Sequence, residues 1–382
     1  MNGETPSLAR AEIDLAAIAH NLRELRRAIQ TEARVMAVVK ANGYGHGAVP
    51  VARAALDAGA DALAVARLPE GVALRAAGIS APILVLGPVP PSAATDLAAA
   101  DLTGTVTSLE GSQALAQEAR KAGIRLPVHV KVDTGMGRLG LLCSPRPDGV
   151  RAAARAVAEI DRLSNLQMEG VFTHFAAADA ADLTFARRQL DRFHTFLEAM
   201  TAEGVAVPFR HAANSGAVLT LPEAHFDLVR PGISLYGFYP SNEVARDRVD
   251  LRPAMTLKTR LLHLKRVPAD FPVSYGMTYR TPAPTTLATV AVGYADGLDR
   301  LLSSRGRMTI RGQSAPIVGR VCMDLTILDV GNIPDAAVGD TVTVFGGDGP
   351  SVDEIATLTG TIHYEVVSTV TARVTRVYRG GE

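Results

Sequence analysis

The chain has 382 residues, 47% of them hydrophobic, which is enough for two or three domains with a sizeable buried core. Lysine and arginine number 39, as do aspartate and glutamate, so neither nucleic acid nor an anionic membrane surface is expected as the main partner. No apolar run approaches the ~18 residues of a membrane span, and charged residues interrupt the amino-terminal stretch, which argues against an anchor or a signal peptide. The two cysteines favour a reducing, cytoplasmic location, and the absence of zinc-type Cys/His spacing predicts no metal.

Short apolar runs alternate with alanine-rich amphipathic segments between Arg34 and Gly237. The runs are nearly continuous, as expected of buried parallel strands. They predict strands over Val35–Lys40, Ala62–Ala66, Ile83–Leu86, Gly104–Thr107, Val128–Val132, Gly170–His174, Phe209–Ala213 and Leu228–Ile233. Eight strands with intervening helices in about 200 residues predict a (β/α)8 TIM-type barrel, and a doubly wound open sheet is the alternative.

Helices are expected between these strands and ahead of the first one. The candidates between strands are Val49–Ala58, Glu70–Ala77, Leu109–Ala122 and Phe185–Ala202, and several of them end at a glycine. Ahead of the first strand, an apolar stripe with helical spacing is formed by Ile18, Leu22, Leu25 and Ile29. This stripe predicts a helix that closes the floor of the barrel.

The character of the sequence changes after Gly237. Apolar runs are now separated by turn sequences such as Gly-Asn, Gly-Asp and Gly-Gly-Asp-Gly, which is typical of an all-β domain. The predicted strands are Met255–Lys265, Thr286–Gly293, Met308–Arg311, Ile317–Val321, Leu325–Val330 and Thr341–Phe345. We therefore predict a barrel over residues 10–240 and a mostly β domain over residues 241–382, together with residues 1–9.

Cations and strong hydrogen-bonding groups follow the predicted barrel strands, at the end where barrels of this kind build their active sites. These residues are Lys40, Lys131, Arg138, His174, Asn214, Ser215 and Arg230. So regular a placement predicts a site for an anionic ligand, and most simply for a phosphorylated one.

Lys40 closes an apolar strand and precedes a segment with glycines at 43, 45 and 47. Burial lowers the pKa of a lysine, which is what a Schiff-base lysine requires, although a lysine here could also simply extend to solvent. The glycines would let the backbone pass close to a bound ring or phosphate. Ser215-Gly216 and Gly232-Ile233 fall where barrels often bind phosphate, and tight turns are the alternative reading.

The segment 135–140 matches the dinucleotide pattern G-x-G-x-x-G and follows a predicted strand. Pro145 and Pro147 come soon after it, and no helix opens at its last glycine as that motif requires. We therefore reject a dinucleotide site.

Seven stretches of the sequence resemble alanine racemases. They are 38–47 (VVKANGYGHG), 129–140 (HVKVDTGMGRLG), 230–237 (RPGISLYG), 273–276 (VSYG), 293–297 (GYADG), 319–324 (GRVCMD) and 362–365 (IHYE). They occur in family order along most of the chain, and together they are highly specific. The resemblance implies a pyridoxal-phosphate enzyme that interconverts L- and D-alanine.

The resemblance also assigns roles around the cofactor. Lys40 would form the internal aldimine, and Arg230 would face the pyridine nitrogen with His174 hydrogen-bonded behind it. Arg138 would lie near the phenolic oxygen and the substrate carboxylate, and the lysine at the position of Lys131 is often carbamylated in the family. The remaining cofactor-binding residues would be Tyr44, Asn214, Ser215, Gly232, Ile233 and Tyr364.

Racemisation removes a proton from one face of the α-carbon and returns it to the other, so two bases on opposite faces serve best. By resemblance these are Lys40 and Tyr275, the latter supplied by the second subunit of a homodimer. A free tyrosine has a pKa of about 10, so Arg138 would supply the positive charge that lets it act as a base. Met323 would approach the substrate carboxylate, and the access channel would be lined by Tyr294, Arg300 and Arg320.

Without the flanking motifs, Tyr275 and Tyr294 would pass for ordinary half-buried tyrosines and Met323 for a core residue. Two other functions also stay open. Amino-acid decarboxylases pair a similar barrel with a β domain, and a pyridoxal-phosphate carrier without turnover is the non-enzymatic alternative. The sequence does not decide how strictly alanine is preferred over serine, nor whether the role is biosynthetic or catabolic.

Overall fold

The computed structural model describes residues 8–381, which divide into two compact units. The barrel unit comprises Ala17–Gly43 and Ala48–Arg252. The C-terminal unit combines the residues up to Ala16, the short segment Tyr44–Gly47 and the chain from Pro253 onward. No helix within residues 8–381 is both long enough and apolar enough to cross a membrane.

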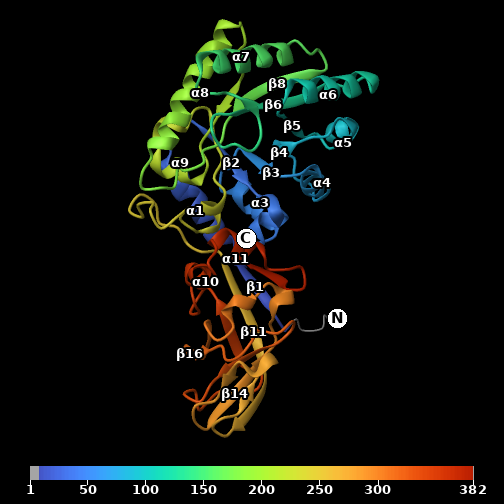
Figure 1. Ribbon diagram of the computed structural model, residues 1–382. Coiled ribbons are helices and arrows are strands. Elements are labelled where there is room, and N and C mark those ends of the chain that lie inside the picture. The colour runs from blue at the N-terminus through green and yellow to red at the C-terminus, as the bar shows by residue number, and fades with distance from the viewer. Residues whose placement is uncertain (1–7, 382) are drawn as a thin grey trace. The chain divides into compact units, whose positions relative to one another are not determined.

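The barrel unit is built on parallel strands in the order β10-β2-β3-β4-β5-β6-β8-β9 (Figure 1). Their bounds are β2 (Arg34–Val38), β3 (Ala62–Val65), β4 (Ile83–Pro88), β5 (Thr103–Val106), β6 (Leu126–Asp133), β8 (Leu166–Phe172), β9 (Phe209–His211) and β10 (Leu228–Val229), and β7 (Leu141–Leu142) pairs with β6. The edge strands β9 and β10 are joined by backbone hydrogen bonds from Asp227 and Arg230 to the carbonyls of Arg210 and Ala213. The prediction of a (β/α)8 barrel is confirmed.

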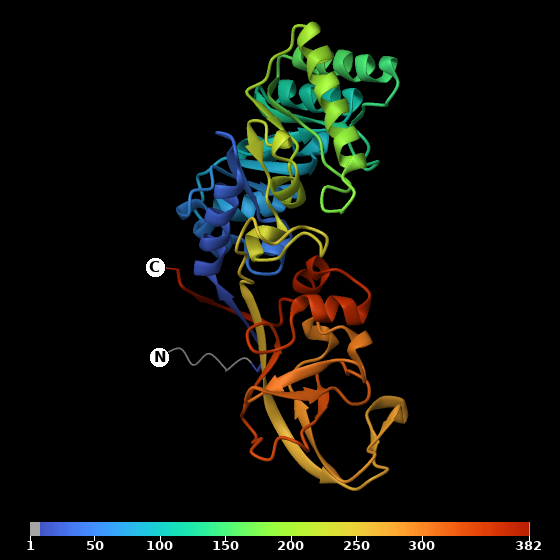
Figure 2. The same ribbon diagram turned by 90° about the vertical axis from the view of Figure 1, so that its left-hand side faces the viewer.

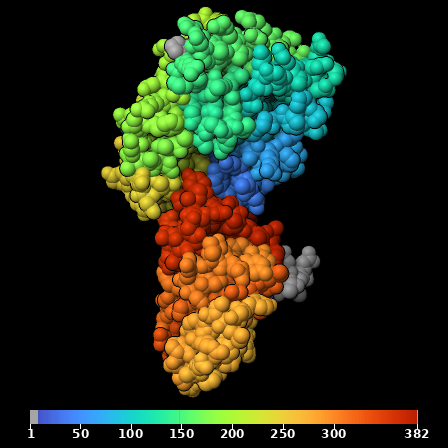
Figure 3. All heavy atoms as spheres, in the orientation of Figure 1, coloured from blue at the N-terminus to red at the C-terminus, as the bar shows by residue number. Residues whose placement is uncertain are grey.

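Helices cover the outside of this barrel, and those between residues 100 and 200 form the green surface in Figure 3. Their bounds are α3 (Ala48–Asp57), α4 (Leu68–Ala76), α5 (Ala94–Ala99), α6 (Leu109–Lys121), α7 (Pro147–Asp161), α8 (Thr184–Ala202) and α9 (Ser215–Thr220), with short 3-10 turns η1 (Pro91–Ala93), η2 (Pro222–Ala224) and η3 (Ile233–Tyr236). On β6, fully buried Val128, Val130 and Val132 alternate with polar His129 and Lys131. Since alternate residues of a strand face opposite sides, the apolar side chains face the helices and the polar ones face the barrel interior.

Helix α1 (Leu15–Ala28) forms as its apolar stripe predicts, but its expected place on the barrel floor is wrong. The side chain of Asn21 donates to the carbonyl of Leu235, which follows the last barrel strand. One and a half turns later, Arg26 donates to the carbonyl of Ala33, just before the first residue of β2. The helix therefore runs along the outside of the barrel beside β10 and β2, as an outer-layer helix does.

The C-terminal unit is mostly β, as predicted. Its main sheet has the order β16-β15-β18-β11-β1-β19, and β14 pairs with β11 and β17. The bounds are β1 (Arg10–Asp14), β11 (Met255–Val267), β14 (Thr285–Val290), β15 (Arg307–Ile310), β16 (Gln313–Pro316), β17 (Thr326–Asp329), β18 (Thr341–Phe345) and β19 (Thr375–Arg379), with helices α10 (Val352–Thr359) and α11 (His363–Ser368). Separately, β12 (Pro272–Val273) pairs with β13 (Tyr279–Arg280), and Figure 2 shows this excursion standing out from its own unit.

The predicted strand Ile317–Val321 is wrong. Arg311 and Gly312 both have positive φ and form a two-residue hairpin turn after β15, so the returning strand begins at Gln313. Of the predicted strand, only Ile317 keeps a single bridge, to Leu328. The expected β-domain segment 1–9 lies mostly outside the described residues, of which it includes only 8 and 9.

Candidate functional site

Four cationic side chains gather where the barrel strands end. Burial lowers the pKa of Lys40, and the charge of Arg138 lowers it further. Burial also lowers the pKa of Lys131 to about 8, and Arg230 and Arg138 add to this effect. The Nζ atom of Lys131 lies 5.4 Å from the ring centre of Phe172. A desolvated, mutually repelling set of cations of this kind is a site for an anion and keeps a lysine amine available as a nucleophile.

Arg230 is the most deeply held of these cations, with only 3% of its surface exposed. One terminal nitrogen donates to Nδ1 of His211 at 2.6 Å, and the other donates to the carbonyls of Thr173 and Ala212 at 2.8 and 3.0 Å. Nδ1 of His174 lies 3.4 Å from the same guanidinium. The structure thus brings His174 and Arg230 together, but His211 is the closer partner.

Two further histidines of the barrel, His211 and His129, were not among the predicted site residues. Nε2 of His211 lies 2.8 Å from Nδ1 of His129, and the ring of His211 stacks on Phe172 at 4.7 Å between centres. Burial lowers the pKa of His129 to about 3, with the charge of Arg230 adding to this, so that ring is neutral. A histidine inside each of two predicted buried strands, Val128–Val132 and Phe209–Ala213, was the available signal, but nothing in the sequence showed that the two meet.

The loop ahead of α9 and the loop after β10 meet around one hydroxyl. Oγ of Ser215 accepts hydrogen bonds from the backbone N–H groups of Gly232 and Ser234, at 2.9 and 3.3 Å. Asn214 caps α9, because its Oδ1 accepts from the N–H of Ala217 at 3.0 Å. Oγ of Ser234 is buried and has no hydrogen-bond partner within residues 8–381. An unsatisfied buried hydroxyl is costly, so this loop is suited to an acceptor such as a phosphate oxygen.

The segment after Lys40 is a left-handed turn. Ala41, Asn42 and Tyr44 have φ of 53°, 54° and 50°, a conformation that costs roughly 1–3 kcal/mol for each such residue. The turn is held in part by Glu70, whose Oε1 accepts from the N–H of Ala41 at 2.6 Å. Strain that persists in this way is typical of functional sites.

Two glycines of this motif, Gly45 and Gly47, pack closely against other parts of the C-terminal unit. A Cβ on Gly45 would lie 2.2 Å from the carbonyl oxygen of Val367, and one on Gly47 would lie 2.0 Å from the hydroxyl of Tyr378. These glycines therefore make room for the protein's own atoms. In the same unit the ring of Tyr44 lies 6.2 Å from that of Tyr364, between centres.

Tyr275 stands on the exposed β12–β13 excursion, in the 3-10 turn η4 (Tyr275–Met277), and 72% of its surface is exposed. The preceding Ser274 has a φ of 63°, and its hydroxyl donates to the carbonyl of Arg320 at 2.7 Å. A Cβ on Gly276 would lie 3.3 Å from a terminal nitrogen of Arg320. The structure therefore brings the motif of Tyr275 next to Arg320.

Tyr294 and Met323 are brought together by backbone contacts. The N–H groups of Tyr294 and Ala295 donate to the carbonyls of Cys322 and Met323, both at 3.0 Å. A Cβ on Gly293 would lie 2.3 Å from the carbonyl oxygen of Met323, so only glycine permits this approach. The motifs 273–276, 293–297 and 319–324 are thus neighbours in the fold.

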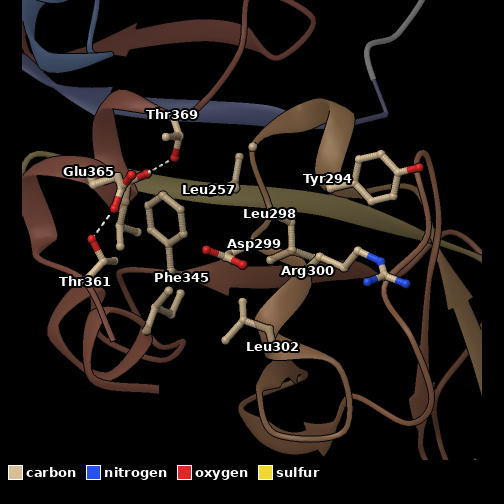
Figure 4. Close-up of a pocket in the computed structure, with 13 residues that line it drawn as sticks. Leu257, Tyr294, Leu298, Asp299, Arg300, Leu302, Phe345, Thr361, Glu365 and Thr369 are labelled. Atoms are coloured by element: carbon tan, nitrogen blue, oxygen red, sulfur yellow. Dashed lines mark hydrogen bonds between the residues drawn. The ribbon is translucent and has the colours of Figure 1, made fainter. Parts of the chain in front are cut away.

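Tyr294 and Arg300 also line a cavity of about 210 Å³ within the C-terminal unit. Figure 4 shows their side chains extending to the same side, away from Glu365 and Thr361 on the opposite side of the cavity. Asp299 lies between these two groups of side chains (Figure 4), and its carboxylate accepts a hydrogen bond from the N–H of Leu301 at 2.7 Å.

Residues 13–240 match the family model for the alanine racemase N-terminal domain, and residues 254–378 match that for the alanine racemase C-terminal domain. The chain belongs to the alanine racemase family. The alanine racemase of Desulfosudis oleivorans is 52% identical over 376 residues, which are 97% of this chain and 96% of that protein. The match over both domains argues against the decarboxylase and carrier alternatives.

Solved structures of the family share the fold. Alanine racemase of Clostridium difficile superposes with a TM-score of 0.93 at 37% identity, covering 98% of this chain and 97% of that one. Alanine racemase of Bartonella henselae, solved with covalently bound pyridoxal phosphate, superposes with a TM-score of 0.87 at 29% identity, covering 98% and 100%.

Proposed function

We propose that Lys40 and Tyr275 are the two bases that exchange the α-proton when this member of the alanine racemase family interconverts L- and D-alanine. The chain is a pyridoxal-phosphate-dependent isomerase. The observation that carries the assignment of Lys40 is its place at the end of β2, where burial and Arg138 lower the pKa of its amine. A lysine that is neutral more often than an exposed one can both bond to a carbonyl and accept a proton.

The residues present fit pyridoxal phosphate. Bound to Lys40, the cofactor withdraws electrons from the substrate and makes the α-proton acidic. The loop around Ser215, with the unsatisfied hydroxyl of Ser234 beside it, suits the phosphate. The residues proposed to hold the phosphate and its surroundings are Tyr44, Asn214, Ser215, Gly232, Ile233 and Tyr364.

Arg230 is proposed to face the pyridine nitrogen. A guanidinium only donates hydrogen bonds, so this nitrogen would accept one and stay unprotonated. An unprotonated ring withdraws electrons less strongly, which restrains side reactions such as transamination. His174 would support Arg230 from behind, and Arg138 would hold the substrate carboxylate.

Lys131 is proposed to be carbamylated. With a pKa of about 8, a fraction of its amine is neutral at physiological pH and can attack carbon dioxide. The N–C bond forms, the amine loses a proton, and a carbamate anion results. That anion would offset the charges of Arg138 and Arg230 and orient Arg138.

The protein is proposed to act as a homodimer in which Tyr275 and Met323 of each copy reach the site of the other. Tyr275, Met277 and Met323 have exposed fractions of 72%, 60% and 52%, and large apolar side chains gathered on one unit indicate a contact surface. Tyr294, Arg300 and Arg320 are proposed to line the access channel. Crowding by Met323 and Tyr364 would favour a small substrate side chain.

The domain limits proposed from the sequence are 10–240 for the cofactor-binding barrel and 241–382, with residues 1–9, for the β-rich domain. A cytoplasmic location is also proposed, and it is supported by the two cysteines, Cys143 and Cys322, which are both free.

The two-base scheme is tested by wash-in of solvent deuterium during turnover of each alanine enantiomer. Lys40→Ala is expected to abolish racemisation together with the visible absorbance of the bound cofactor. Tyr275→Phe is expected to suppress proton abstraction from one enantiomer far more than from the other. Equal, small losses from both enantiomers would refute the assignment of Tyr275, and activity in Lys40→Ala would refute that of Lys40.

A further inference from the structure

A second cavity, of about 390 Å³, lies in the barrel unit at the end where the strands begin. This volume falls within the range of about 300–1,000 Å³ that is usual for small-molecule sites. All eight barrel strands contribute to its lining, which includes the apolar side chains of Met36, Ile83, Leu84, Met168 and Leu228. Lys40 and the other cations of the proposed active site follow the opposite ends of these strands. We call it the floor cavity, and it is separate from the proposed active site.

His129 lines the floor cavity and presents a hydrogen-bond donor to it. Arg230 can only donate, so Nδ1 of His211 is an acceptor and the proton of that neutral ring sits on Nε2. This proton is donated to Nδ1 of His129, which leaves the proton of His129 on its own Nε2. Within residues 8–381 that Nε2 has no hydrogen-bond partner, although the ring is only 4% exposed. This N–H is therefore free to donate to a molecule bound in the floor cavity.

Arg34, an exposed residue, adds a positive charge to the lining of the same cavity. Its guanidinium makes no hydrogen bond or ion pair with the described residues and lies 5.2 Å from the ring centre of Phe209. The ring of Phe209 in turn stacks on His129 at 6.2 Å between centres. Arg34 and His129 thus both contact the ring of Phe209.

Two carboxylates also line the floor cavity, and their positions restrict where an anion fits. Asp61 is already neutralised, since its Oδ2 accepts from Arg26 and from the N–H of Val35, both at 2.7 Å. Glu169 accepts from the neutral amide of Gln167 at 3.2 Å and from the hydroxyl of Thr103, and burial raises its pKa. An anionic group would therefore lie on the side of Arg34 and His129, away from Glu169.

We propose that the floor cavity binds a small carboxylic acid with an apolar body. Its carboxylate accepts from the guanidinium of Arg34 and from Nε2–H of His129, and its hydrocarbon part lies against Met36, Leu84 and Leu228. Charge-assisted hydrogen bonds of this kind are the strong ones, and the apolar lining supplies the burial. The proposal does not depend on the roles given to Lys40 and Tyr275.

The test is a calorimetric titration of the cofactor-loaded enzyme with hexanoate, near neutral pH, with the uncharged hexanamide in parallel. We expect saturable binding of one hexanoate per chain and at least about tenfold weaker binding of hexanamide. Arg34→Met should weaken hexanoate at least about tenfold, while Glu169→Gln should strengthen it by removing a like charge. Arg155→Met, which removes a positive charge from an exposed site on α7, is the matched control and should change nothing.

A carboxylate could also bind beside Arg138, so Arg138→Met is titrated as well. Hexanoate binding that survives Arg138→Met and is lost in Arg34→Met supports the floor cavity. The opposite pattern, equal affinity for the amide, or an unchanged affinity in Arg34→Met would overturn the proposal. The ring ¹⁵N signal of His129 must also shift on addition of hexanoate. Repeating the titration in Lys40→Ala separates a failure here from a failure of the proposed active site.

Discussion

Replacing His211 with alanine tests the buried chain of hydrogen bonds inside the barrel. The imidazole accepts from Arg230 at 2.6 Å, donates to His129 at 2.8 Å and stacks on Phe172. Alanine removes all of these contacts at once, and the lack of exposure at His211 leaves little room for water to replace them.

The expected loss follows from these contacts. Leaving a buried charged donor without its acceptor costs about 1.5–3 kcal/mol, and the orphaned nitrogen of His129 adds about 1 kcal/mol. The lost ring stacking on Phe172 adds about 0.5–1.5 kcal/mol. We therefore expect His211→Ala to lower the free energy of unfolding by about 3–5.5 kcal/mol.

The assay is urea unfolding followed by far-ultraviolet circular dichroism, because the chain has no tryptophan. The matched control is His194→Ala on the exposed face of α8, where the ring makes one aromatic contact, to Phe226 at 5.1 Å. In His194→Ala the free energy of unfolding should fall by less than about 1.5 kcal/mol. A loss below about 1 kcal/mol in His211→Ala would show that Arg230 finds another acceptor, and the reasoning would fail.

Three further predictions concern other parts of the chain. Gly45→Ala should destabilise the protein by more than about 3 kcal/mol in the same assay, because a Cβ there meets Val367 at 2.2 Å and φ is +82°. Gly59→Ala is the matched control: its φ of +103° is also positive but the space around it is open, so it should cost only the backbone strain. The unaltered protein supplied with ¹³C-bicarbonate should show a carbamate signal that grows as pH rises through about 8, the pKa of Lys131, and that is absent in Lys131→Arg. Glu12 has a pKa below its usual value, because hydrogen bonds from Lys258 and Arg10 outweigh the opposing effect of burial. The contribution of the Glu12 carboxylate to the free energy of unfolding is therefore present above pH 4.5 and lost as pH falls through the lowered pKa. The difference in stability between Glu12→Gln and the unaltered protein should thus close in acid. A difference independent of pH would contradict this prediction.

The barrel strands could be predicted because each one is a short apolar run, but their ends could not. The strand predicted over Leu228–Ile233 is in fact only two residues long, since Pro231 cannot donate to the sheet. Strand β1 was missed although its polar and apolar residues alternate, because it is only five residues long and its partners, β11 and β19, lie far along the chain. Pairing with strands so distant in sequence cannot be recognised from the residues around β1.

The residues of the candidate site also differ in whether the sequence alone could predict them. Lys40 and Arg230 stand out from the sequence as cations at the ends of apolar strands. In the link from His129 through His211 to Arg230, the first two residues are 82 positions apart and the last two 19, and only the folded barrel brings all three together. Tyr275 differs from these residues. An exposed tyrosine shows no physical sign of a catalytic role, and only the family motif around it indicated one.

The short segment Tyr44–Gly47 belongs to the C-terminal unit, although it lies between two stretches of the barrel unit. The chain therefore passes from one unit to the other four times, counting the passages after Ala16 and after Arg252. Neither unit is a continuous stretch of sequence, so no simple truncation yields either one intact. A gene fragment ending at Arg252 would keep Tyr44–Gly47 but lose Val367 and Tyr378, against which Gly45 and Gly47 pack. Such a fragment is expected to be digested first at this segment by a protease, four residues from Lys40.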